Sequence, residues 1–209
     1  MSRLWQKILA VVLACALVGG AYLYIRRAPT PLIGLAPRLA MRYVTPNDPV
    51  VKHTLNDALA TRPLFRNDVE AIESWVSSLR YIDDREAHYM PEYWQYPSET
   101  IRLGHGDCED LALLLCSLLR AHGVPPEQVY VAVGGGHAFV ILFRSLPIGN
   151  EWVPTYIEPQ ASGWIVQDIV NILLLPLDYQ VDLLFNDAYS WSGADMGQIA
   201  ERLSAREAA

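Results

Sequence analysis

Residues 104–110 read Gly-His-Gly-Asp-Cys-Glu-Asp, and an almost unbroken apolar run over residues 111–119 follows directly. Asp107 is a good N-cap, and a segment that is apolar almost all round is typical of a buried helix. Gly123, with two prolines close behind it, provides the stop. This stretch therefore predicts a buried helix that carries Cys108 at the bend between a glycine-broken loop and its first turn.

Strand-like segments follow the predicted helix. Residues 128–133 and 137–143 are rich in valine and other apolar side chains, and three glycines at 134–136 separate them. Glycines between two such segments are typical of a hairpin turn. A third strand is expected over residues 152–158. A helix followed by antiparallel strands predicts an α+β domain, in which the helix with Cys108 packs on an antiparallel β-sheet.

Other segments of the domain give weaker signals. Helices are expected over residues 51–60 and 68–80, and the second shows apolar residues at helical spacing behind an Asn-Asp pair that can cap it. Residues 81–103 are rich in Tyr, Trp and Pro, which predicts an irregular loop. Residues 185–191 contain Phe and Trp and are expected to pack back onto the domain.

Three side chains that can act together lie at the edges of these predicted elements. Cys108 opens the helix, His137 opens a strand directly after the three glycines, and Glu158 ends the next strand. A thiol, an imidazole and a carboxylate are the parts of a cysteine nucleophile, its base and the group that orients the base. Each residue alone also has a simpler interpretation, as a small buried cysteine, a structural histidine or a solvated glutamate.

Activation of the predicted nucleophile depends on its neighbours. The thiolate is the attacking form, and an ordinary cysteine with a pKa of about 8.5 is mostly protonated at neutral pH. A helix N-terminus favours the thiolate, but Asp107, Glu109 and Asp110 place negative charge in the same turn. The helix end alone is therefore not expected to activate Cys108, and we expect His137 to come close to it.

Several spaced motifs over roughly residues 70–160 resemble the transglutaminase-like superfamily, and are most similar to its prokaryotic cysteine proteinases. In chain order the matching segments are Trp94 with Pro97-Ser98-Glu99-Thr100, then Gly104-x-Gly106-Asp107-Cys108-Glu109-Asp110-x-Ala112, Leu118-Leu119-Arg120-Ala121-x-Gly123, His137-Ala138-Phe139-Val140, and Trp152 with Ile157-Glu158-Pro159.

This resemblance implies a papain-like core in which a helix bearing the nucleophile packs on an antiparallel sheet. It implies Cys108 as the nucleophile, His137 as general base and acid, and Glu158 as the group that orients His137. Glu158 stands where the family more often has Asp. The resemblance also implies that Trp94 or a neighbouring aromatic residue supports the oxyanion.

The expected activity is acyl transfer at an amide. Cys108 would attack a peptide or Gln-type carboxamide and form a thioester, and water would release it. The expected partner is a protein or peptide substrate, and no cofactor is expected. Two alternatives stay open. One is a catalytically inactive module of the same fold that binds a protein at the membrane, and the other is a metal site built from His105, Cys108 and His137.

Composition excludes several classes of protein. A net charge of -7 argues against a nucleic-acid partner, because phosphate binding needs a basic surface. Hydrophobic residues make up 52% of the chain, which is enough for a core. Cys116 lies inside the apolar run and is expected in the core. On one helix it would lie about 12 Å along the axis from Cys108, too far for a disulfide.

The N-terminal segment is expected to meet a membrane. The run from Ile8 to Ile25 carries no charge and approaches the roughly 20 residues of a spanning helix. Residues 1–27 are therefore interpreted as a single-pass anchor. A cleaved signal segment and a lipid-modified Cys15 are the alternatives.

The remaining boundaries follow from composition. Prolines predict an extended linker over residues 28–50, leading to a transglutaminase-like domain over 51–200 and a tail over 201–209. Basic residues flank the apolar run on both sides. Those that precede it favour a domain outside the cytoplasm, which is the orientation we expect.

Overall fold

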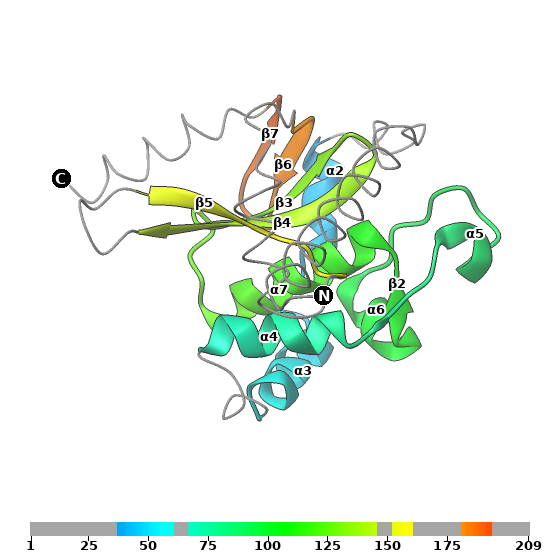
Figure 1. Ribbon diagram of the computed structural model, residues 1–209, viewed down its shortest axis with the longest axis horizontal. Helices are drawn as coiled ribbons and strands as arrows, with labels where there is room; N and C mark the ends of the chain where they lie inside the picture. Colours follow the sequence, from blue (N-terminus) through cyan, green and yellow to red (C-terminus); the bar gives the residue numbers. More distant parts are fainter. Residues whose placement is uncertain (1–36, 61–66, 146–151, 161–180, 194–209) are drawn as a thin grey trace, which may run out of the picture.

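The computed structural model describes residues 37–60, 67–145, 152–160 and 181–193 (Figure 1). The helices in these ranges are α2 (Pro37–Ala40), the 3-10 helix η2 (Met41–Tyr43), α3 (Pro49–Ala60), α4 (Asp68–Ser77), α5 (Asp84–Ala87), α6 (Pro97–Leu103) and α7 (Cys108–His122). The strands are β1 (Arg80–Tyr81), β2 (His105–Gly106), β3 (Val129–Gly134), β4 (His137–Ser145), β5 (Trp152–Ile157), β6 (Leu183–Phe185) and β7 (Ser190–Ser192).

The central helix α7 confirms the prediction from its sequence. It begins at Cys108, and the backbone N–H of the preceding Asp107 donates to the Asp110 carboxylate at 3.3 Å. It ends at His122, and the Gly123 that caps it has a φ of 105°. Glycine adopts a positive φ without a steric penalty, so Gly123 lets the chain leave the helix. All residues from Cys108 to Leu119 are buried, as expected for a helix that is apolar almost all round.

The five-stranded sheet has the order β5-β4-β3-β6-β7, and every neighbouring pair is antiparallel. β3 and β4 form the predicted hairpin, with Gly134 opposite His137. Gly135 and Gly136 between them have φ values of 59° and 79°, the left-handed values that a tight two-residue turn requires. The α+β class and the antiparallel sheet predicted from the sequence are confirmed.

The helix α7 lies between this sheet and a second layer made of α3, α4 and α6 (Figure 1). Its leucines share one core with Val131 and Val140 from the sheet face that it covers. Neighbouring strand residues point to opposite faces, so Tyr130 and Ile141 belong to a second cluster on the other face. Burying one leucine side chain contributes about 1.5–3 kcal/mol, and the apolar run therefore fixes α7 on the sheet.

The predicted extended linker over residues 28–50 is wrong where the structure describes it. From Pro37 on, the chain forms α2 and η2, and Val44 is buried in the core. The Thr45 N–H donates to the hydroxyl of Ser117 on α7 at 3.0 Å. Proline is well tolerated in the first turn of a helix, where its missing N–H would have no partner. The prolines here start short helices that pack on the domain.

Two other segments have more regular structure than predicted. The segment 81–103 contains α6, with Pro97 at its start and Gly104 in the left-handed region at its end. The segment 185–191 does pack back onto the domain, as predicted, but it does so by pairing. β6 lies against β3 and β7 extends the sheet beyond it.

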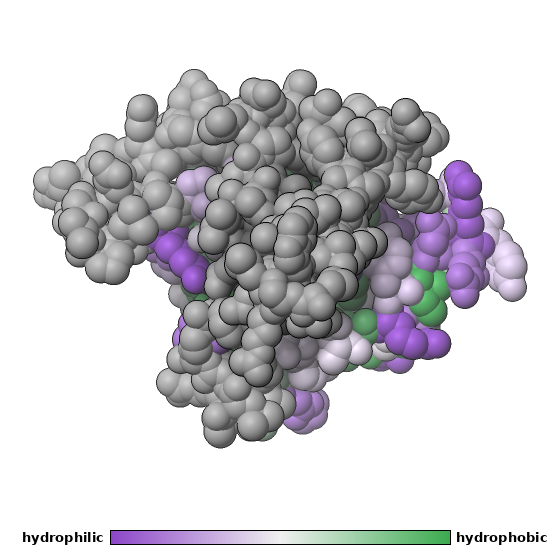
Figure 2. All heavy atoms as spheres, viewed as in Figure 1, coloured by the Kyte–Doolittle hydropathy of each residue, from purple (hydrophilic) through white to green (hydrophobic). Residues whose placement is uncertain are grey.

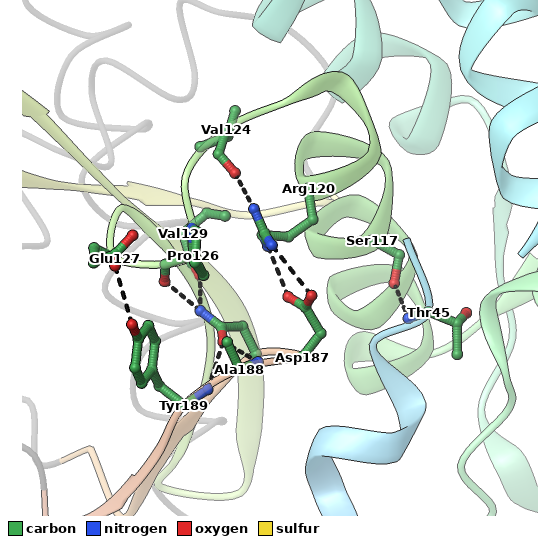
Figure 3. Close-up of polar contacts among 11 residues, drawn as sticks. Thr45, Ser117, Arg120, Val124, Pro126, Glu127, Val129, Asp187, Ala188 and Tyr189 are labelled. Carbon is green, nitrogen blue, oxygen red and sulfur yellow. Dashed lines mark hydrogen bonds and ion pairs between the residues drawn. The ribbon is translucent and has the colours of Figure 1, made fainter. Parts of the chain in front are cut away.

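Polar contacts hold these C-terminal strands to the rest of the domain (Figure 3). The buried Asn186 side chain donates to the backbone carbonyls of Pro126, which precedes β3, and Val129, which begins it. Its side-chain oxygen accepts two backbone N–H groups from the turn that follows Asn186. Arg120 on α7 donates to Asp187 at 2.7 Å. A buried amide with all its partners present stabilises a single arrangement, so these contacts fix β6 beside α7.

No helix within the described ranges is long and apolar enough to cross a membrane. Residues 1–27, which are expected to form the anchor, lie outside those ranges. The same holds for the expected tail over residues 201–209.

Candidate active site

The thiol of Cys108 belongs to the first residue of α7, and the chain leading to it is held by backbone pairing. β1 pairs in parallel with β2, which places Tyr81 opposite Gly106. A Cβ at Gly106 would lie 2.5 Å from the Cβ of Asp110, so the close approach of loop and helix requires glycine. Cys108 is only 8% exposed. The sequence thus places the sulfur in a nearly enclosed position.

His137 and Glu158 meet at the edge of the sheet, as predicted. His137 is the first residue of β4, and Glu158 follows the last residue of the neighbouring β5. The Nε2 atom of His137 lies 2.8 Å from Oε2 of Glu158. The histidine ring also stacks on Phe139, with ring centroids 6.2 Å apart. One ring nitrogen is therefore committed to a carboxylate, which leaves Nδ1 for another partner.

Cys108 reaches the same edge of the sheet. The backbone N–H of Ala138, the residue after His137, donates a hydrogen bond to the sulfur of Cys108. The helix α7 packs against β4. The structure therefore brings the start of α7 to the start of β4, so that the thiol lies beside the residue that follows His137.

The family model described as the transglutaminase-like superfamily matches residues 53–169. This range is more than half of the sequence and contains Cys108, His137 and Glu158. The chain belongs to the transglutaminase-like superfamily. The resemblance found in the spaced sequence motifs is confirmed.

Several solved structures match this chain at low sequence identity. Calcium-bound LapG of Legionella pneumophila is 19% identical, with a TM-score of 0.47 over 83% of this chain and 99% of its own. A second LapG structure is 20% identical, with a TM-score of 0.47 over 86% and 99%. A Cytophaga hutchinsonii protein described as a candidate cysteine protease is 20% identical, with a TM-score of 0.38 over 63% and 45%. No curated protein matches significantly.

Acidic side chains dominate the surroundings of the thiol in this member of the transglutaminase-like superfamily. The Cys108 thiol donates a hydrogen bond to Oε2 of Glu109, 3.2 Å away. Burial, followed by the charges of Glu109 and Asp107, raises the pKa of Cys108 well above its ordinary value, and the Ala138 N–H opposes this only in part. As predicted, the acids of this turn oppose formation of the thiolate.

The acids of this turn shift one another as well. Burial and the charge of Asp107 raise the pKa of Asp110 to about 8. The same two causes raise the pKa of Glu109 to about 11, and burial raises that of Asp107 to about 7. Without a counter-charge, this cluster therefore holds protons at neutral pH and lacks its full negative charge.

The same carboxyl groups could hold a divalent cation. Asp84, Glu92 and Glu109 bring oxygen atoms within 4.8 Å of one another, and so do Asp84, Asp107 and Asp110. One oxygen each of Asp84, Asp107 and Glu109 is buried and has no hydrogen-bond partner among the described residues. Carboxylate oxygens are the ligands that Ca²⁺ and Mg²⁺ prefer, and an unpaired buried carboxylate is costly. The donor set fits a hard cation.

The alternative metal site expected from the sequence, made of His105, Cys108 and His137, is not assembled among the described residues. Among the described side chains, the groups close enough to share an ion consist of acids, joined in one case by Cys108. None of these groups includes His105 or His137. Burial and the nearby Arg80 lower the pKa of His105, so this ring favours its neutral form.

Trp94 is held by contacts with Glu92 and two aromatic rings. Its Nε1–H donates to Oε1 of Glu92 at 2.7 Å, and its ring packs between Tyr43 and Phe185. Trp94 thus closes the core beside the acidic cluster. The indole N–H is thus bonded to Glu92 in this structure, and the oxyanion role that the resemblance implies for Trp94 stays a prediction.

Two residues near the site carried no signal in the sequence. The side-chain nitrogen of Gln160 lies 3.0 Å from Oε2 of Glu158 and 3.1 Å from Nε2 of His137. Tyr81 is 53% exposed, and burial together with the charge of Cys108 raises the pKa of its phenol, which stays neutral beside the thiol. The one sequence feature that could have indicated the first contact is the single proline between Glu158 and Gln160.

The loop between β1 and α6 forms an exposed edge of the molecule. Where the described residues reach the surface at the right of Figure 2, hydrophilic side chains predominate around a smaller hydrophobic area. Tyr89 at the tip of this loop is 91% exposed and has a φ of 56°, an uncommon value for an aromatic residue. This edge leads back to Asp84, so the acidic cluster lies at the base of a solvent-exposed loop.

Proposed function

We propose that this protein is a membrane-anchored cysteine hydrolase, which cleaves an amide bond of a protein or peptide through Cys108, His137 and Glu158. The observation that supports this most directly is the 2.8 Å contact between His137 Nε2 and Glu158 Oε2, made beside a thiol that receives the Ala138 N–H. Membership of the transglutaminase-like superfamily is consistent with acyl-transfer chemistry at this site.

The first half of the reaction transfers the acyl group to sulfur. Nδ1 of His137 takes the proton of the Cys108 thiol as sulfur attacks the carbonyl carbon of the amide. Glu158 holds the ring in the tautomer that leaves Nδ1 as acceptor and stabilises the charged imidazolium. The imidazolium then gives its proton to the leaving amine nitrogen, the carbon–nitrogen bond breaks and a thioester remains.

The second half releases the acyl group. Water attacks the thioester carbon and gives a proton to His137, and the carbon–sulfur bond breaks, which regenerates the thiol and frees a carboxylic acid. In both halves the carbonyl oxygen gains negative charge. The backbone N–H of Cys108 lies in the first turn of α7, where N–H groups have no partner within the helix, and can stabilise that charge.

The resting thiol is protonated in this mechanism. Its pKa is raised by burial and by Glu109 and Asp107, so proton transfer to His137 has to accompany the attack. Neutralising the acidic cluster would ease that step, because less negative charge would then oppose the thiolate.

Covalent labelling of the full chain tests the proposal. A peptide carrying a thiol-reactive group in place of the scissile amide should modify Cys108, and His137→Ala should reduce the rate by about 100-fold or more, the range for a general base. His122 on α7 pairs with Asp68 away from the thiol, so His122→Ala is the matched control and should label like the parent. Equal labelling of the parent and His137→Ala would exclude the mechanism.

The alternative is a catalytically inactive module that binds a protein at the membrane. The raised pKa of Cys108 favours it, because a protonated thiol is a poor nucleophile. The two functions separate in the same experiment, since the inactive module would bind a peptide without modification of Cys108 at any pH between about 6 and 9.

The anchor is tested separately from the chemistry. The full chain should stay in the membrane fraction after alkaline extraction, and a chain beginning at residue 28 should not, because the uncharged run from Ile8 to Ile25 supplies the apolar surface. Protease accessibility in sealed vesicles then reports on which side of the membrane the domain lies.

A further inference from the structure

Gln160 contacts both members of the His137–Glu158 pair. Its side-chain nitrogen lies 3.0 Å from Glu158 Oε2 and 3.1 Å from His137 Nε2. We propose that Gln160 is a positioning residue, which holds the Glu158 carboxylate against His137 and so keeps the imidazole in its working orientation. This inference rests on the function proposed above.

Which atoms can donate determines how Gln160, His137 and Glu158 are hydrogen-bonded. A carboxylate only accepts hydrogen bonds, so Oε2 of Glu158 accepts one from the amide N–H of Gln160 and one from Nε2–H of His137. Two donors that share one oxygen must lie close together, which accounts for the 3.1 Å between their nitrogens. The opposite orientation of the Gln160 amide would place its oxygen against the carboxylate, with two acceptors facing each other.

The local chain makes this arrangement rigid. Pro159 separates Glu158 from Gln160 and fixes its own φ near −65°, so both side chains leave the end of β5 in a set relation. With Nε2 protonated and engaged, the lone pair on Nδ1 of His137 faces away from Glu158 and can take the proton of the thiol.

Glu158 needs such a support more than an aspartate would. The glutamate side chain has one more rotatable bond, and each free torsion adds orientations that do not reach His137. The amide N–H of Gln160 restricts that freedom, because it donates a hydrogen bond to Oε2 at 3.0 Å.

The pH profile of Cys108 alkylation in the full chain tests this role. Iodoacetamide modification at Cys108 is followed by peptide mass spectrometry, which separates it from Cys15 and Cys116. Gln160→Ala and Gln160→Met should both slow the reaction about threefold to tenfold near pH 7, the range for one hydrogen bond to a charged group acting through a second residue. The shape of both profiles should also differ from that of the parent, because His137 is then held less firmly against Glu158.

Two comparisons separate positioning from a general effect on structure. Gln160→Met keeps most of the side-chain volume, so a loss shared by both variants belongs to the amide group. Gln128 precedes β3 at the end of the hairpin away from His137, and Gln128→Ala should leave both rate and profile unchanged. Thermal unfolding of all variants reports whether the fold is intact.

A double-mutant cycle decides whether Gln160 acts through Glu158. In a Glu158→Ala background, Gln160→Ala should change neither the rate nor the profile. The same slowing with and without Glu158, or a Gln160→Ala profile equal to that of the parent, overturns the inference. If His137→Ala also leaves alkylation unchanged, the proposed function itself fails. If His137→Ala slows it and Gln160→Ala does not, only the role of Gln160 fails.

Discussion

The thiol of Cys108 donates its hydrogen bond to Glu109, 3.2 Å away, while the backbone N–H of Ala138 approaches the same sulfur from β4. Glu109 favours the protonated thiol and the Ala138 N–H favours the thiolate. Burial and the acids prevail, since the pKa of Cys108 is raised well above its ordinary value. The reactivity of this thiol therefore depends on the charge of its neighbours.

Replacing Glu109 with Gln should make Cys108 more reactive. The change replaces the carboxyl group that accepts the hydrogen bond of the thiol with an amide, whose N–H can donate to the thiolate. We expect the alkylation rate at neutral pH to rise about tenfold, equivalent to roughly one pKa unit. Glu86→Gln, at an exposed acid on α5, is the control. An alkylation profile identical to that of the parent would contradict this account.

Stability without a bound cation should fall as pH rises. In the folded chain the pKa of Asp110 is about 8 and that of Asp107 about 7, both raised from 3.8 chiefly by burial. The folded state therefore binds these protons more tightly than the unfolded chain. Their contribution is complete below about pH 4 and is lost as pH rises through 7 and 8. In EDTA, urea denaturation should show a free energy of unfolding higher at pH 5 than at pH 8.5 by an amount on the order of a few kcal/mol.

The matched variant for this prediction is Asp107→Asn. Asparagine is an equally good N-cap, so the start of α7 is kept while one proton-binding group is removed. The decline of stability with pH should become shallower by up to one proton. A slope as steep as that of the parent would show that Asp107 does not carry the effect.

Calcium should stabilise the domain through the buried carboxyl groups. Asp84 contributes to both oxygen clusters, and one of its oxygens has no hydrogen-bond partner among the described residues. Saturating Ca²⁺ should raise the thermal midpoint by roughly 5–10 °C, and EDTA should reverse the change. Asp84→Asn should abolish the response, whereas Asp57→Asn on an exposed face of α3 should retain it. An equal response in both variants would mean that calcium binds elsewhere.

Short-range signals suffice for elements that their own residues determine. Asp107 before an apolar run and Gly123 after it define α7, and three glycines define the β3–β4 hairpin. The same kind of signal fails where proline is ambiguous. Proline content predicts a linker over residues 28–50 and a loop over 81–103, but Pro37 and Pro97 start helices, because a helix start also tolerates proline.

The candidate site divides in the same way. Cys108, His137 and Glu158 stand out because each is a reactive side chain at the edge of a predicted element. The partners that tune them do not, since their contacts depend on how distant segments pack. Asp84 joins the acidic cluster from α5. Trp94 donates its indole N–H to Glu92, a contact that the spacing of residues in the sequence does not reveal.

Asn186 should be important for the stability of the domain. Its buried side chain makes four hydrogen bonds to backbone groups, and truncation would leave those groups without partners. We expect Asn186→Ala to lower the free energy of unfolding by about 2–4 kcal/mol. Asn56→Ala on an exposed position of α3 is the matched control and should change it by less than about 0.5 kcal/mol.

Substitutions at Glu158 should separate the charge of this residue from its length. Glu158→Gln keeps the length but removes the negative charge that stabilises the imidazolium. Its amide can also turn its N–H toward Nε2–H of His137, which would place two donors against each other. We expect labelling of Cys108 by the peptide probe to fall about 10²- to 10⁴-fold, the range seen when the orienting acid of a triad is replaced.

Glu158→Asp keeps the charge but is one methylene shorter, so the 2.8 Å contact with Nε2 of His137 would lengthen and the loss should be smaller. Because Gln160 also bonds to Oε2, the Asp variant loses that support too, and its activity should depend little on whether residue 160 is Gln or Ala. Labelling that is equal in the parent and Glu158→Gln would assign Glu158 to the structure of the sheet edge and not to the chemistry.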